Sequence, residues 1–131
     1  MFKQFSFSKN QIEKYYKSAL RDFSLSRSDN PEIIFVFSYN CLLKLAITVC
    51  AKNNLRIQPR LGHHVALIEK MSELLDNQDI ALIADDMRSK RNKDLYDGGV
   101  IISLKEAKLY HEFVANLIKQ VEKYLGKPKL I

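Results

Sequence analysis

The sequence predicts an all-α fold, an up-and-down bundle of about five helices that forms a single domain over residues 1–131. Apolar side chains recur at helical spacing through most of the chain, whereas no stretch alternates apolar and polar residues over six or more positions. Hydrophobic residues make up 47% of the chain, and there are only 4 glycines and 3 prolines. This composition and length suit one sizeable hydrophobic core.

A first helix is expected over residues 8–26. Ser8 and Gln11 have the spacing of a capping box, in which a serine side chain and a glutamine side chain satisfy each other's backbone amides. Apolar side chains then recur at helical spacing at Ile12, Tyr15, Tyr16, Ala19, Leu20 and Phe23.

A second helix is expected from Asn30 to about Asn53. Asn30 can cap the free amides of the first turn, and Pro31 suits the first helical position because its missing N–H is not needed there. The helix is apolar on nearly every face, which is typical of a central helix. Its length raises the possibility of a membrane span, but Asn40 and Lys44 near its middle favour a buried helix instead.

The segment Leu55–Gly62 is expected to be a loop because it contains a proline and a glycine. A third helix follows, with apolar residues at helical spacing from Val65 to Leu75. A fourth helix is expected from about Asp79 to Asp97, where two glycines can adopt the positive φ of a helix end. Its inner stripe is predicted to be Ile80, Ile83, Ala84 and Met87.

The last helix is expected to open at a second capping box, formed by Ser103 and Glu106. Its inner stripe is predicted from apolar residues that recur every four positions, at Leu109, Phe113, Leu117, Val121 and Leu125. The glycine and proline in residues 125–131 predict a loose tail after this helix.

The charge balance and the cysteines narrow the class of protein. A net charge of +6 favours acidic partners such as RNA, DNA or a phosphorylated ligand. Cys41 and Cys50 fall on one helix, about 13 Å apart along its axis, so reduced structural thiols are expected. The first ten residues lack the features of a signal peptide, which predicts a cytoplasmic protein with no membrane partner.

The fourth helix carries the residues with most chemical potential. Arg88, Asn92 and Tyr96 are spaced four apart on one face, with Arg91 beside them. Arginine offers a planar fork for phosphate, asparagine can donate and accept, and tyrosine supplies a ring for stacking. Lys90, Lys93 and Arg88 are candidates for steering a nucleic acid. The alternative is that these residues form no site and are a solvent-exposed basic helix end, which the helix dipole favours.

Other chemical signals are weak. His63 and His64 are adjacent and His111 is distant, so no metal-ligand spacing is recognisable, and capping or interface roles are favoured for these side chains. No phosphate loop or nucleophile elbow is present, and we expect neither a metal nor an organic cofactor. Tyr39 falls on an apolar face, where its hydroxyl needs a buried partner.

The order of three segments resembles the HEPN family (higher eukaryotes and prokaryotes nucleotide-binding) over residues 8–125. These segments are "FSYNCLLKLAITVCAKNN", "PRLGHHVALIEKM" and "RNKDLYDGG". The resemblance implies a helical bundle that forms a homodimer, often paired with a minimal nucleotidyltransferase in a toxin–antitoxin module. It also implies RNA or nucleotide binding, and in many members a metal-independent endoribonuclease activity.

The family motif is an arginine, usually followed by a polar residue, with a histidine four to six residues further on. Arg91 and Asn92 match its first elements, while Tyr96 stands where the histidine is expected, as in a branch that ends in Tyr-Asp. The resemblance implies that Arg91 and Asn92 hold a phosphate and that Tyr96 contacts base or sugar. A tyrosine with a pKa near 10 is a poor general base. Two hypotheses therefore stay open, a ribonuclease toxin and a non-catalytic dimerisation or partner-binding module.

Overall fold

We describe residues 1–96, 98 and 102–126 of a computed structural model, and only the backbone of residues 94–96. The described residues form five helices and two short strands, which confirms the predicted all-α bundle of about five helices. In chain order these are β1 (Phe2–Gln4), α1 (Lys9–Leu25), α2 (Pro31–Lys52), β2 (Leu55–Ile57), α3 (His63–Leu74), α4 (Gln78–Tyr96) and α5 (Leu104–Tyr124). The predicted helix end at Asp97 and the predicted tail at residues 127–131 lie outside the described residues.

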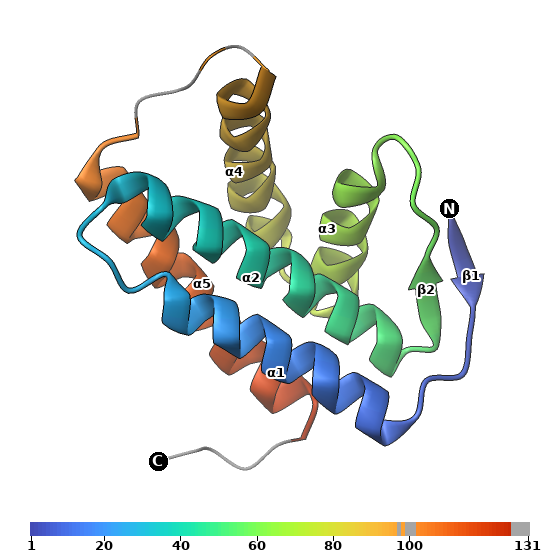
Figure 1. The fold of residues 1–131 in the computed structure, drawn as a ribbon. Coiled ribbons are helices and arrows are strands. Elements are labelled where there is room, and N and C mark those ends of the chain that lie inside the picture. Colours follow the sequence, from blue (N-terminus) through green and yellow to red (C-terminus); the bar gives the residue numbers. More distant parts are fainter. Residues whose placement is uncertain (97, 99–101, 127–131) are drawn as a thin grey trace.

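Helix α2 is the centre of the fold. It packs against α1, α3, α4 and α5, and Figure 1 shows α3 and α4 as an antiparallel pair lying across it. Among the described residues, α2 is the one helix long and apolar enough to cross a membrane. Most of its apolar stretch is buried by the other helices, as expected of a core helix. The prediction that α2 is the central helix of the bundle is confirmed.

The predicted helix starts are confirmed in detail. The Ser8 hydroxyl accepts a hydrogen bond from the backbone N–H of Gln11 at 3.1 Å, and the Gln11 side chain accepts one from the Ser8 N–H at 2.8 Å. Ser103 and Glu106 form the second capping box at the start of α5. Asn30 caps α2 by accepting from the N–H of Glu32 at 2.9 Å. These signals depend only on neighbours in the chain, so the sequence reveals them directly.

Two short strands are missing from the sequence-based prediction, which treated Leu55–Gly62 as a loop. Phe2–Gln4 pairs antiparallel with Leu55–Ile57, in the register Phe2 with Ile57 and Gln4 with Leu55. Strands of three residues are too short to show the alternation of apolar and polar side chains that predicts a strand. Pairing over such a distance in sequence also leaves no local signal.

The predicted inner stripe of α5 is partly wrong. Leu109 is 58% exposed, whereas Tyr110 and Val114 are buried instead. Leu117 and Val121 are buried as predicted. Residues spaced four apart advance by about 400° on a helix, so a strict four-residue row drifts by about 40° at each step away from a straight stripe. Over the length of α5 this drift moves the start of the predicted row to the solvent side.

The inner face of α4 positions its outer residues. Ile80, Ala84 and Met87 are fully buried against the core, and Ile83 is partly buried beside them, as predicted. With this face held inward, the remaining residues of α4 are directed along its two flanks.

Cys41 and Cys50 on α2 are buried free thiols, and burial raises the pKa of each to about 12. The prediction of unbridged structural thiols is confirmed.

A candidate phosphate-binding pocket

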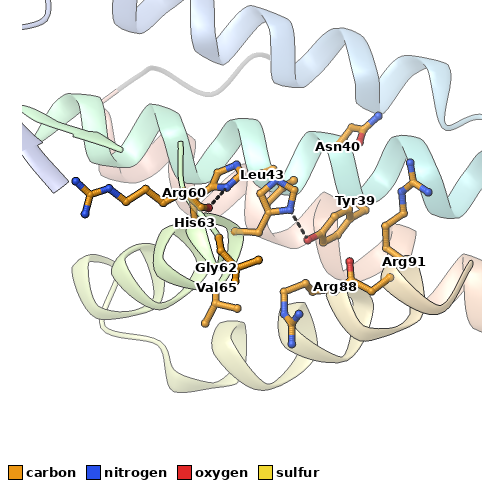
Figure 2. Close-up of a pocket in the computed structure, with 12 residues that line it drawn as sticks. Tyr39, Asn40, Leu43, Arg60, Gly62, His63, Val65, Arg88 and Arg91 are labelled. Atoms are coloured by element: carbon orange, nitrogen blue, oxygen red, sulfur yellow. Dashed lines mark hydrogen bonds between the residues drawn. The ribbon is translucent and has the colours of Figure 1, made fainter. Parts of the chain in front are cut away.

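A pocket of about 500 Å³ lies where α2, α3, α4 and the loop before α3 meet. Figure 2 shows residues from each of these elements around it. From α4 the lining residues are Arg88, Arg91 and Asn92, which occupy one flank of the helix. The structure therefore brings together three of the residues that the sequence singled out. The side chain of Tyr96 lies outside the described residues.

Helix α2 forms a second wall of the pocket. Tyr39, Asn40 and Leu43 line it there, and Tyr39 is only 2% exposed. Burial raises the pKa of Tyr39 to about 12, although the positive charges of Arg88 and Arg91 act in the opposite direction. The phenol is therefore neutral near pH 7, and its hydroxyl is available as a hydrogen-bond donor or acceptor.

The loop before α3 contributes Arg60, Leu61 and Gly62. Gly62 has φ +81°, in the left-handed region that glycine adopts without strain, and this conformation turns the chain into α3. Gly62 provides no side-chain hydrogen bond to the first turn of α3. The positive end of the α3 dipole therefore faces the pocket without a side-chain cap, an arrangement that favours anions.

Two adjacent histidines at the start of α3 also line the pocket. Their rings lie 4.4 Å apart, centroid to centroid, in an edge-to-face arrangement. Nδ1 of His63 lies 2.8 Å from the backbone carbonyl oxygen of Arg60, and Nδ1 of His64 lies 3.3 Å from the hydroxyl oxygen of Tyr39. Figure 2 marks both contacts. Each ring is therefore held by a hydrogen bond to a different element of the fold.

Electrostatics distinguish His64 from a solvent-exposed histidine. Burial lowers the pKa of His64 below its usual value, and the charges of His63 and Arg88 add to this effect. His64 is therefore neutral near pH 7. Its Tyr39 contact satisfies the buried phenol, which answers the expectation that this hydroxyl needs a partner.

The charge of the pocket is one-sided. Arg60, Arg88 and Arg91 line it, and no aspartate or glutamate is among the described lining residues. Nearby, the Nε–H of Arg88 donates to Asp85 at 2.9 Å, which engages one of the five N–H donors of the guanidinium group. Three arginines around one pocket of this size suit a ligand that carries negative charge.

On the other flank of α4, one lysine is bound by two carboxylates and a phenol. Lys90 lies 3.2 Å from a carboxylate oxygen of Asp86 and 3.1 Å from one of Glu106, and it donates a hydrogen bond to the hydroxyl of Tyr110. The Tyr110 hydroxyl in turn donates to Asp86. Hydrogen bonding to Tyr110, Glu106 and Asp86 raises the pKa of Lys90. This network, here called the α4–α5 staple, ties the two helices together.

Lys90 and Lys93 were candidates for contacting nucleic acid, and neither lines the pocket. Lys90 belongs to the staple, whereas the Lys93 side chain is exposed. The pocket contains three groups of residues that sequence reasoning did not assign to a site, namely the histidine pair, the Tyr39–Asn40 pair and Arg60. Gly62 directly before two histidines was the one local signal that could have drawn attention to this loop.

No group of three or more His, Cys, Asp or Glu side chains in the described part of the chain is arranged to hold a metal ion. The two histidines instead contact each other, the backbone carbonyl of Arg60 and the hydroxyl of Tyr39. Comparisons with protein-family models, with curated proteins and with solved structures find no match for this chain.

Proposed function

We propose that this protein binds RNA through the phosphate backbone, at the pocket between α2, α3 and α4. The observation that carries this proposal is that Arg60, Arg88 and Arg91 all line one pocket, whose described lining residues include no carboxylate. Guanidinium groups bind phosphate through paired, charge-assisted hydrogen bonds. The net charge of +6 supports attraction of a polyanion to the protein.

The remaining lining residues suit the other parts of a nucleotide. Asn40 and Asn92 can donate and accept hydrogen bonds at base or sugar edges. Leu43 and Val65 supply apolar surface against which a base can lie, and Leu61 at the rim is fully exposed. A pocket of about 500 Å³ falls within the range of small-molecule sites and can hold one nucleotide.

The protein is proposed to be HEPN-like, with Arg91 and Asn92 as the first elements of the family motif and Tyr96 at its end. On this proposal Arg91 holds the scissile or bound phosphate, Asn92 positions it, and Tyr96 contacts base or sugar. The resemblance also supports a cytoplasmic homodimer that acts with a minimal nucleotidyltransferase in a toxin–antitoxin module. A sedimentation measurement that finds only monomers would contradict the homodimer.

A non-catalytic binding module is the second candidate. The presence of Tyr96 in place of the motif histidine favours it, because a phenol with an ordinary pKa is a weak proton acceptor at neutral pH. In this case the same pocket binds RNA or a nucleotide without turnover. The two candidates share the binding site and differ only in whether bound RNA is cleaved.

Binding is tested with a double variant and a matched control. Arg88→Gln with Arg91→Gln removes two positive charges from the pocket, while Lys14→Gln with Lys17→Gln removes two exposed charges from α1. Loss of two charge-assisted hydrogen bonds predicts a fall in affinity for single-stranded RNA of about 100-fold, or about tenfold for each arginine. The α1 control is expected to change affinity by less than about threefold.

The readout is fluorescence anisotropy of a labelled RNA oligonucleotide at low salt. Equal losses in the two double variants would mean that RNA responds to total charge and not to this pocket. Absence of binding by the unaltered protein would overturn the proposal outright. Circular dichroism of each variant checks that the fold is intact.

A further inference from the structure

The histidine pair lies in the wall of the pocket proposed to bind RNA. His63 and His64 come from α3, whereas Arg88 and Arg91 come from α4, so the two groups meet only in the folded chain. Histidine is the side chain best suited to proton transfer near neutral pH. The pair therefore supplies, from another helix, the kind of group that Tyr96 does not.

The contact of His63 determines which of its nitrogens carries the proton. A backbone carbonyl oxygen can only accept a hydrogen bond, so at 2.8 Å from Arg60 the Nδ1 atom of neutral His63 must be the donor. The Nε2 atom is then the unprotonated nitrogen, with a lone pair that can accept a proton. The fold thus holds His63 in the tautomer that a general base requires.

The contact of His64 allows the opposite tautomer, because its partner is a hydroxyl that can donate. The Tyr39 phenol is buried and neutral, and its hydroxyl can donate to Nδ1 of His64 at 3.3 Å. With Nδ1 as the acceptor, Nε2 of neutral His64 carries the proton and is a hydrogen-bond donor. In this arrangement the two adjacent imidazoles have complementary roles, His63 as a proton acceptor and His64 as a hydrogen-bond donor.

We propose that His63 is the general base of a metal-independent RNA cleavage in this pocket, with His64, positioned by Tyr39, as a hydrogen-bond donor to the reacting phosphate. This proposal rests on the proposed function, because the substrate is the RNA that the arginines hold. The substrate class is a phosphodiester with a free 2′-hydroxyl on the 5′ side of the cleaved bond. DNA lacks this group and is not a substrate.

The reaction is an internal transesterification. Nε2 of His63 takes the proton of the 2′-hydroxyl as the 2′-oxygen forms a bond to phosphorus, and the bond from phosphorus to the 5′-oxygen breaks. The departing 5′-oxygen takes a proton from water, and His63 returns its proton to solvent, so the protons balance. The Nε2–H of His64 and the arginines stabilise the negative charge on the non-bridging oxygens. The products are a 2′,3′-cyclic phosphate and a 5′-hydroxyl.

Cleavage and binding are measured side by side in EDTA, on an RNA oligonucleotide and on the matching DNA oligonucleotide. The unaltered protein is expected to cleave only the RNA and to leave a cyclic phosphate. His63→Gln is expected to lower the cleavage rate by about 100-fold or more, with RNA affinity changed by less than about threefold. His111→Gln, which alters a histidine stacked on Phe23 away from the pocket, is the matched control and is expected to cleave normally.

The tautomers give a readout that does not depend on activity. Nitrogen chemical shifts of the two imidazoles are expected to show the proton on Nδ1 in His63 and on Nε2 in His64 near pH 7. Tyr39→Phe keeps the buried ring but removes the hydroxyl, so His64 is expected to become a mixture of tautomers while His63 is unchanged. The same variant is expected to lower cleavage several-fold and to alter its pH profile.

The outcomes separate the two proposals. RNA binding without cleavage by the unaltered protein, normal cleavage by His63→Gln, or the reverse tautomers would each overturn the role of the histidines and leave RNA binding standing. Absence of RNA binding would overturn the proposed function together with this inference.

Discussion

The two flanks of α4 carry similar basic residues in different surroundings. On one flank Lys90 is bound by Asp86, Glu106 and Tyr110, so its charge is balanced within the fold. On the other, Arg88 and Arg91 line a pocket whose described walls contain no carboxylate. Because the helix and the type of charge are shared, the difference lies in what α2, α3 and α5 place opposite. Lys90 is bound by carboxylates of both α4 and α5, whereas the ion pair of Arg88 with Asp85 stays within α4 and Arg88 still lines the pocket.

The largest expected effect is on the stability of the fold, and it comes from removing a buried side chain that holds α4 against the core. Met87 is fully buried on the inner face of α4, and Met87→Ala is expected to destabilise the fold by about 2–5 kcal/mol through lost burial and a cavity. Leu82→Ala alters a side chain on the same helix that is 72% exposed, and a change within about 0.5 kcal/mol is expected. Urea denaturation measures both, and equal losses would mean that α4 is not held by its inner face.

The next effect is on the salt dependence of RNA affinity, which is expected to differ between variants of the two flanks. Each phosphate contact with single-stranded nucleic acid contributes about 0.7 to the slope of log affinity against log salt concentration. Arg88→Gln with Arg91→Gln is therefore expected to reduce that slope by about 1.4, or roughly sevenfold in affinity between 50 and 200 mM salt. Lys90→Gln with Lys93→Gln is expected to leave the slope nearly unchanged. Equal slope changes in the two double variants would erase the distinction between the flanks.

A smaller effect concerns the staple. Tyr110→Phe keeps the buried ring but removes the hydroxyl that links Lys90 with Asp86. We expect a loss of stability of about 1 kcal/mol, typical of one hydrogen-bonding group, with RNA affinity within about twofold of the unaltered protein. Thermal unfolding and anisotropy measure the two quantities. Weaker RNA binding at unchanged stability would assign the staple to the site instead of to the fold.

The smallest effect is a dependence of stability on pH. Burial lowers the pKa of His64, and burial together with the charge of Arg27 lowers that of His111. Below about pH 6.5, the ordinary histidine value, the unfolded chain binds more protons than the folded one, so stability falls as pH falls from there toward the lowered pKa. His64→Gln and His111→Gln are each expected to make the fall between pH 7 and 5 shallower. Urea denaturation across this range checks the slope, and an unchanged slope in both variants would contradict the assignment.

Local signals predicted most of the fold. The capping boxes at Ser8 and Ser103 and the cap at Asn30 are contained within a few residues, and each marks an observed helix start. The strand pair of Phe2–Gln4 with Leu55–Ile57 joins segments that are far apart in sequence, and three residues are too few to reveal a period.

The site was predictable only in part, because it also depends on contacts between segments that are far apart in sequence. Helical spacing alone groups Arg88 with Asn92, and both line the pocket. The partnership of Tyr39 with His64 bridges α2 and α3, so it exists only after the helices have packed. The separation of Lys90 from the pocket likewise depends on Tyr110 and Glu106 of α5. Spacing within a helix shows which residues share a face, whereas tertiary packing decides what that face meets.

The pocket between α2, α3 and α4 is the proposed binding site for RNA phosphate. The most direct measurement is a titration of the labelled protein with a short single-stranded RNA, followed by NMR of backbone amides and arginine side chains. We expect the largest shift changes on residues 60–65 and on Arg88, Arg91 and Asn92, with small changes at Lys14 and Lys17. Changes centred on Lys90 and Glu106, or spread evenly over the basic surface, would contradict this assignment.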